Sequence, residues 1–215
     1  MKYKGLIFDF DYTLGDGTDV ITECFAYGLT GLGYKAESRE RIRFTIGMTL
    51  ANAFKELTGN SDADTILEFE RLYKEKADEV LVAGTIIYPF ALEMLRSLNE
   101  QNVKFGIVST KRHIRIQQIF DKYDLGSLPS VIVGGDDVKE KKPSPEGLLL
   151  AINTLGLQKS EVLYIGDHVI DAQAASSAGV DFAAVLTGTS VCAEFEQYKH
   201  CYITENVMQL YEMLQ

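Results

Sequence analysis

The sequence predicts an α/β protein built on a doubly wound, mainly parallel sheet, with an α-helical insertion after the first strand. Three observations indicate this fold. Short apolar runs alternate with helical patterns from residue 85 onward, as in βαβ units whose strands lie parallel. Another apolar run lies near the N-terminus, and residues 16–84 carry helical patterns alone. We therefore expect an α/β core formed by residues 1–15 and 85–215, and a helical domain formed by residues 16–84.

Along the chain, the first strand is expected at residues 6–8, a continuous apolar run typical of a buried parallel strand. Turn residues then lead the chain out of the sheet. In the first helix of the insertion, Ile21, Phe25 and Leu29 recur at helical spacing. Four helices, a plausible small bundle, are expected at residues 20–33, 38–44, 50–57 and 62–82.

After residue 85 the chain alternates strand and helix without repeats or low-complexity segments. Helices are expected from Pro89 through Leu98, at 114–120, at 148–155 after a helix-start signal at 143–146, and at 172–178, where Gly179 ends the last one. Strands are expected at residues 103–108, 131–133, 162–165 and 182–186, with a short edge strand at 201–203.

Composition limits the possible functions. The chain has 215 residues, enough for one sizeable core with a smaller companion domain. Its formal net charge of −10 argues against nucleic-acid and anionic-membrane surfaces. Cys24, Cys192 and Cys201 lack metal-ligand spacing, so we expect reduced, mostly buried thiols in a cytoplasmic protein. No signal peptide or membrane span is expected, and the oligomeric state, monomer or homodimer, is left open.

Two carboxylates follow the first strand. Asp9 and Asp11 share one face of an extended segment, where their charges repel unless a cation lies between them. Mg²⁺ is the simplest candidate, because this hard ion takes one or two carboxylates and often holds substrate phosphate. A solvated Asp-x-Asp turn is the alternative.

Polar residues follow three further segments of the predicted sheet: Ser109 and Thr110, Lys142, and Asp167 with Asp171. Each alone has a plain structural explanation, namely a helix cap, a solvated turn, or an N-cap with a first-turn acid. In a doubly wound sheet, however, all of them meet at one edge. That set suits phosphoryl transfer, which requires positioning and charge neutralisation, a carboxylate nucleophile and a second acid.

These motifs resemble those of the haloacid dehalogenase superfamily, and most closely its phosphoglycolate-phosphatase-like branch. The resemblance rests on four segments in this order: Asp9-Phe-Asp-Tyr-Thr-Leu14, Ser109 after a strand, Lys142-Pro-x-Pro145, and Gly166-Asp-x-x-x-Asp171. It covers essentially the whole chain and implies a Rossmann-like core with a helical cap.

The resemblance also implies roles at the end of the first strand. Asp9 would be the nucleophile and a Mg²⁺ ligand. Asp11 would be the general acid/base, with its backbone carbonyl in the metal shell, and Thr13 would fix the turn between them. Aspartate at position 11 favours phosphatase over dehalogenase chemistry, because a dehalogenase has no leaving alkoxide to protonate.

For the remaining motifs, the resemblance implies that Ser109 hydrogen-bonds the phosphoryl group and that Lys142 neutralises it. Asp167 would bind Mg²⁺ directly, and Asp171 would orient Lys142 or a metal-bound water. Two positions depart from the common pattern. Tyr12 replaces the usual glycine and either restricts substrates or covers the sheet edge. His168 stands beside the metal acid and either approaches the metal's surroundings or makes a helix-start hydrogen bond.

Substrate choice is expected to lie in the cap, which would exclude water once closed. The candidate contacts are Gly47, Met48 and Thr49 in a loop between two cap helices, with Arg43 nearby as an anion contact or a plain surface charge. This loop lacks the cationic residue with which related mutases grip a second phosphate, which weakens the mutase interpretation.

The sequence thus predicts a Mg²⁺-dependent phosphatase that hydrolyses a small phosphomonoester, such as phosphoglycolate, through an aspartyl-phosphate. Within the superfamily the alternatives are a sugar-phosphate mutase and a pyrophosphatase. From other classes, the alternatives are a phospho-aspartate signalling switch and a catalytically silent binding protein.

Overall fold

The computed structural model describes residues 2–215, and the larger of its two compact units comprises the residues up to Asp16 together with Ile87–Gln215. Its sheet has the strand order β5-β4-β1-β6-β7-β8, and neighbouring strands run parallel. The predicted α/β class and parallel sheet are confirmed. The strands are β1 (Gly5–Phe8), β4 (Lys104–Val108), β5 (Val131–Val133), β6 (Val162–Gly166), β7 (Asp181–Val185) and β8 (Tyr202–Thr204).

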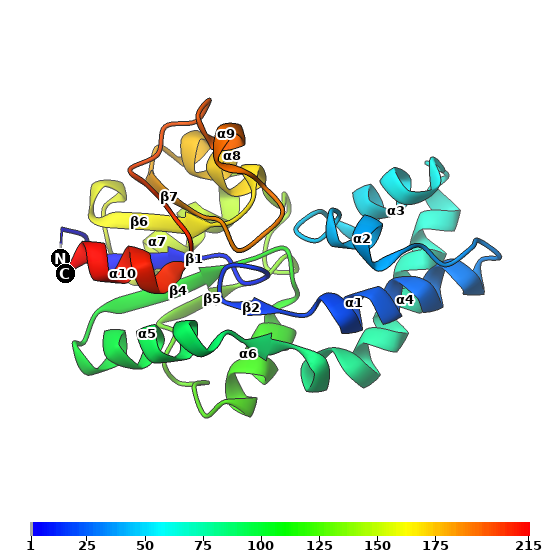
Figure 1. Ribbon diagram of the computed structural model, residues 1–215, viewed down its shortest axis with the longest axis horizontal. Coiled ribbons are helices and arrows are strands. Elements are labelled where there is room, and N and C mark those ends of the chain that lie inside the picture. The colour runs from blue at the N-terminus through cyan, green and yellow to red at the C-terminus, as the bar shows by residue number, and fades with distance from the viewer. Residues whose placement is uncertain (1) are drawn as a thin grey trace. The chain divides into compact units, whose positions relative to one another are not determined.

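Helices cover both faces of this sheet (Figure 1), so the sheet is doubly wound as predicted. One face carries α5 (Pro89–Glu100), α6 (His113–Lys122) and α10 (Val207–Leu214), and the other carries α7 (Glu146–Leu155), α8 (Val169–Ala178) and α9 (Cys192–Phe195). A short 3₁₀ turn, η1 (Lys159–Glu161), precedes β6. The sequence interpretation missed α9 and α10. Helix α9 is too short for a periodic signal, but α10 buries Val207, Leu210, Tyr211 and Leu214 at helical spacing.

The strands are apolar because both of their faces are buried. One cluster packs Ile7, Tyr164 and Phe182 of the sheet against Leu148 and Ala175 of the helices above it. Burying a large apolar side chain contributes about 1.5–3 kcal/mol, so these residues hold the strand ends in place.

The chain reverses direction across the sheet between β1 and β6. From β1 it proceeds to β4 and β5 on one side, then returns to β6 and continues to β7 and β8 on the other. Phe8 pairs with Ile165, and the Asp9 N–H donates to the Ile165 carbonyl at 2.8 Å. Connections leave the carboxyl ends of these two strands in opposite directions, which creates the crevice where open α/β sheets bind ligands. Asp9 and Asp167 follow these two strands.

The second compact unit, Gly17–Ile86, is helical. It contains α1 (Thr18–Gly31), α2 (Arg39–Arg43), α3 (Leu50–Thr58) and α4 (Ala63–Gly84). Phe69 of α4 lies between Phe25 and Phe54, with ring centroids 5.5 and 4.8 Å away. Gly28 lets α1 approach α4 closely, because a Cβ there would lie 2.9 Å from the Phe69 ring. The interpretation of this unit as a cap stays a prediction.

Two short strands were not expected from the sequence. β2 (Gly15–Asp16) and β3 (Ile86–Ile87) pair with each other where the chain leaves the α/β core and where it returns. The expectation that the segment from residue 16 onward lacks strands is therefore wrong at Asp16. A strand of two residues is too short to show an alternating pattern.

The thiols are free as expected, but the expectation that they are mostly buried is wrong. Cys24 is buried in α1, whereas Cys192 and Cys201 are exposed. Cys192 starts the short surface helix α9, and Cys201 precedes the edge strand β8. No helix within residues 2–215 combines the length and apolarity that a membrane span requires.

Candidate active site

Lys142 lies at the centre of a buried cluster of acids. Its Nζ is 2.9 Å from Oδ1 of Asp9 and 2.6 Å from Oδ1 of Asp171. The contact with Asp9 is an ion pair outside hydrogen-bond geometry, whereas Asp171 accepts a hydrogen bond. The Lys142 side chain is 6% exposed, so bulk water screens neither contact well. Residues separated by more than 130 positions in the sequence thus meet at the carboxyl edge of the sheet.

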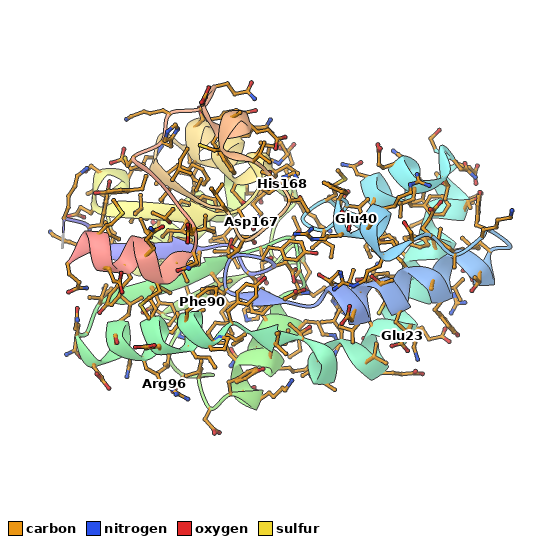
Figure 2. All side chains as sticks on the ribbon, in the orientation of Figure 1. Glu23, Glu40, Phe90, Arg96, Asp167 and His168 are labelled. Atoms are coloured by element: carbon orange, nitrogen blue, oxygen red, sulfur yellow. The ribbon has the colours of Figure 1, made fainter. Side chains whose placement is uncertain are left out.

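Asp167, which is labelled in Figure 2, directly follows β6 and completes this cluster. The side chain is buried, and its Oδ1 accepts a hydrogen bond from the Thr13 hydroxyl at 2.9 Å. Thr13 thereby connects the turn after β1 to the acid after β6. Oxygens of Asp9, Asp167 and Asp171 all lie within 4.8 Å of one another.

Burial makes these acids costly to ionise. It raises the pKa of Asp9 to about 6, with Asp171 adding to the rise and Lys142 opposing it. Burial, then Asp171 and Asp9, raise the pKa of Asp167 well above its ordinary range. Burial alone would lower the pKa of Lys142, but Asp171 and Asp9 outweigh it and raise that pKa. The ammonium is therefore charged at neutral pH, and one positive charge faces three acids.

This donor set fits a divalent metal ion. Three carboxylates around one ammonium leave an excess of negative charge in a buried place, which a divalent cation would neutralise. Carboxylate oxygens suit hard ions such as Mg²⁺, Ca²⁺ and Mn²⁺. Both oxygens of Asp171 already accept hydrogen bonds, from Lys142, the Tyr164 hydroxyl and the His168 N–H. Oδ1 of Asp9 accepts none from residues 2–215, so Asp9 and Asp167 are the two acids best placed to hold such an ion.

Asp11 has a different partner. Its Oδ2 is 3.1 Å from Nζ of Lys111, and its buried Oδ1 accepts no hydrogen bond from any residue in the range 2–215. The Asp11 side chain is not part of the metal-competent group, so its expected place in the metal shell rests on its backbone carbonyl. Lys111 was not singled out in the sequence. A cation two residues after Ser109, at the end of a strand, was the available signal.

The sequence interpretation also missed Tyr164 and Gly188. The Tyr164 hydroxyl lies 2.8 Å from Asp171 Oδ1, 3.2 Å from Lys142 Nζ and 3.3 Å from the Val108 carbonyl. It therefore contacts both members of the Lys142–Asp171 ion pair and holds them in place. At Gly188, a Cβ would collide with the Asp167 carboxylate, so only glycine lets this loop pass over the acid. A tyrosine in an apolar strand and a glycine in a loop carry no local signal of either role.

Tyr12 and His168 have structural positions of their own. Tyr12 adopts a left-handed conformation (φ 62°), is 3% exposed, and its carbonyl accepts a hydrogen bond from the Thr187 hydroxyl. A bulky residue there is strained, which explains why glycine would suit the turn. His168 caps α8, with Nδ1 accepting from the Ile170 N–H at 3.2 Å, and burial lowers its pKa. The helix-start hydrogen bond is the one the structure contains.

Ser109 is buried at the end of β4, where its Oγ accepts a hydrogen bond from the Lys111 N–H at 3.3 Å, and Thr110 follows it half-buried. The other expected substrate contacts belong to the helical unit. Arg43 ends α2, Gly47 has a positive φ of 101°, Met48 follows it, and Thr49 caps α3. Their contact with substrate stays a prediction.

Comparison with known proteins identifies the fold. The model of the haloacid dehalogenase-like hydrolase family matches residues 6–185, which is most of the chain. The chain belongs to this family. It is also similar to the crystal structure of a protein from Bacteroides fragilis described as a haloacid dehalogenase-like hydrolase. The TM-score is 0.94 and the identity is 41%, over 97% of this chain and 100% of that one.

The curated relatives have names that specify an activity, either phosphoglycolate phosphatase or pyrophosphatase. A phosphoglycolate phosphatase from Salmonella choleraesuis is 32% identical over 176 residues, which make up 81% of this chain and 65% of that protein. The chain therefore covers slightly less than two thirds of that relative. The pyrophosphatase PpaX from Listeria monocytogenes is 30% identical over 210 residues, which make up 97% of this chain and 95% of that protein.

Proposed function

We propose that this member of the haloacid dehalogenase-like hydrolase family is a Mg²⁺-dependent phosphatase that acts on a small phosphomonoester through an aspartyl-phosphate. The observation that carries the proposal is the meeting of Asp9, Lys142 and Asp167 in one buried cluster at the carboxyl edge of the sheet. Asp11 and Ser109 follow the adjoining strands β1 and β4, which pair directly.

In the first step, a carboxylate oxygen of Asp9 forms a bond to phosphorus while the bond to the leaving oxygen breaks. Asp11 gives its proton to that oxygen, which leaves as an alcohol. Lys142 and the Ser109 hydroxyl hold the non-transferring oxygens and neutralise their charge. A Mg²⁺ ion held by Asp9 and Asp167 would add charge neutralisation between the nucleophile and the phosphate.

In the second step, Asp11 takes a proton from water as the water oxygen attacks phosphorus, and the Asp9 carboxylate is released. Asp11 is thereby reprotonated, and inorganic phosphate leaves. Tyr164 and Asp171 keep Lys142 in position throughout, because both hold its ammonium.

The substrate proposal is 2-phosphoglycolate, supported by the name of the relative from Salmonella choleraesuis. Inorganic pyrophosphate is the second candidate, supported by a relative whose match spans nearly the whole of both chains. Both are small and carry a second anionic group.

A panel of phosphorylated compounds tests the proposal. Purified protein should release phosphate from 2-phosphoglycolate faster than from pyrophosphate, sugar phosphates and nucleotides. Release should stop when a chelator removes Mg²⁺ and return when Mg²⁺ is restored. Faster release from pyrophosphate would move the assignment to the second candidate. Interconversion of sugar phosphates would instead indicate a mutase, and phosphorylation without turnover would indicate a signalling switch.

Metal binding should stabilise the fold more as the pH rises. A carboxyl group whose folded pKa is raised contributes stability at low pH and loses it as the pH rises through that pKa. For Asp9 the window runs from its ordinary value of 3.8 to about 6. Without divalent ions, the thermal midpoint should therefore fall across this window. Mg²⁺ should offset the loss, because it binds the ionised acids, so the midpoint increase caused by Mg²⁺ should grow with pH. An increase that is independent of pH would contradict the assigned ligands.

A further inference from the structure

Lys111 is a buried cation that the proposed chemistry leaves without a role. Its side chain is 6% exposed, and the Asp11 side chain with which it pairs is 10% exposed. A lysine is rarely this buried unless it is paired, and placing it here costs solvation that the protein must offset. Nζ of Lys111 also lies 5.7 Å from the centre of the buried Phe10 ring, a cation–π contact that stabilises the ammonium. Phe10 is the residue between Asp9 and Asp11 in the sequence.

Lys111 touches two of the proposed catalytic residues through different atoms. Its ammonium is 3.1 Å from Asp11 Oδ2, and its backbone N–H donates to the Ser109 hydroxyl at 3.3 Å. The backbone contact survives any substitution that keeps the main chain in place. A side-chain substitution therefore removes the contact with Asp11 alone.

The ion pair selects one orientation of the Asp11 carboxyl group. With Oδ2 directed at Lys111, Oδ1 is the buried oxygen that accepts no hydrogen bond from residues 2–215. A buried carboxylate oxygen without a hydrogen-bond partner is unfavourable unless a ligand meets it. Oδ1 is thus the oxygen left to exchange a proton with a substrate or a water.

We propose that Lys111 is a positioning residue for the general acid/base: it holds Oδ2 of Asp11 and so presents Oδ1 to the leaving oxygen of the substrate. This inference rests on the proposed function and deepens it. When the Asp11 proton passes to the leaving oxygen, Asp9 bonds to phosphorus and Asp11 becomes a carboxylate. The Lys111 ammonium then faces the negative charge formed in that step, which favours the transfer.

Two aryl phosphates of nearly equal shape separate this role from general damage to the site. Phenyl phosphate needs its leaving oxygen protonated, whereas the p-nitrophenolate anion leaves without a proton. The quantity to compare is kcat/KM, because it reports only the steps up to and including departure of the leaving group. Lys111→Met should lower kcat/KM for phenyl phosphate by about 10–100-fold, part of the general-acid contribution, and for p-nitrophenyl phosphate by less than about threefold.

Two further variants complete the test. Lys111→Arg keeps the charge and should recover much of the loss on phenyl phosphate. Arg112→Met removes the neighbouring cation, whose side chain is 49% exposed and pairs with Asp136. This variant should leave kcat/KM unchanged for both substrates. In an Asp11→Asn background, Lys111→Met should have no further effect on phenyl phosphate, because the residue it positions is gone.

The outcomes distinguish the inference from the function it rests on. The positioning role would be overturned if Lys111→Met lowered kcat/KM equally for both substrates, or if its loss on phenyl phosphate were undiminished in the Asp11→Asn background. Neither result would contradict the proposed phosphatase activity. A wild-type protein that hydrolyses neither aryl phosphate in the presence of Mg²⁺ would overturn the proposed function itself.

Discussion

Asp9→Asn is expected to abolish phosphatase activity while leaving the fold intact. The amide nitrogen and oxygen cannot attack phosphorus as the carboxylate does, so turnover should fall on the order of 10⁴-fold or more. Mass spectrometry of acid-quenched protein should show a phosphoryl adduct on the wild type during turnover and none on the variant.

Stability provides the control for this variant. Burial raises the pKa of Asp9 to about 6, so ionisation of this group at neutral pH lowers the stability of the folded protein. The uncharged amide has nearly the same shape, and the thermal midpoint of Asp9→Asn should therefore not fall in the absence of Mg²⁺. Asp19→Asn, in which an exposed acid of the helical unit is changed in the same way, should keep full activity. Residual turnover close to that of the wild type would rule out Asp9 as the nucleophile.

Lys142→Met is expected to have the largest effect on stability. The substitution keeps the length of the side chain but removes the only ammonium within hydrogen-bond reach of Asp9 and Asp171 among residues 2–215. Breaking a buried ion pair from one side costs about 3–5 kcal/mol, because the remaining charges are left without compensation. Urea unfolding at neutral pH should show this loss, and hydrolysis of every substrate should be lost with it.

The pH dependence of Lys142→Met identifies the cause. Because Lys142 lowers the pKa values of Asp9 and Asp167, its removal should raise them further, and the acids then ionise only at higher pH. The loss of stability relative to the wild type should therefore shrink as the pH falls and the acids become protonated. Lys139→Met, which changes an exposed lysine three positions earlier, should be neutral. A loss of equal size at every pH would indicate a packing defect rather than unbalanced charge.

Much of the fold could be predicted because its signals are local. The apolar runs that became β1, β4 and β6 are buried on both faces, so they appear in the sequence without interruption. Gly179 ends α8 in the left-handed conformation expected of a glycine at that position. By contrast, β2 and β3 exist only because two segments that are 70 or more positions apart pair with each other, and neither segment has a pattern of its own.

For the candidate site, the sequence by itself predicted which acids follow the strands and that Lys142 lies with them, because the residues that follow parallel strands collect at one edge of the sheet. That Ser109 acts together with this group stays a prediction. Only the tertiary structure decided how these groups are paired. Lys142 lies between Asp9 and Asp171, and Asp11 forms an ion pair with Lys111. The Tyr164 hydroxyl donates a hydrogen bond to Asp171, and Gly188 packs against Asp167. The physical reason is that the strength of a charge pair depends on distance and burial, and both are set by packing between elements far apart in the chain.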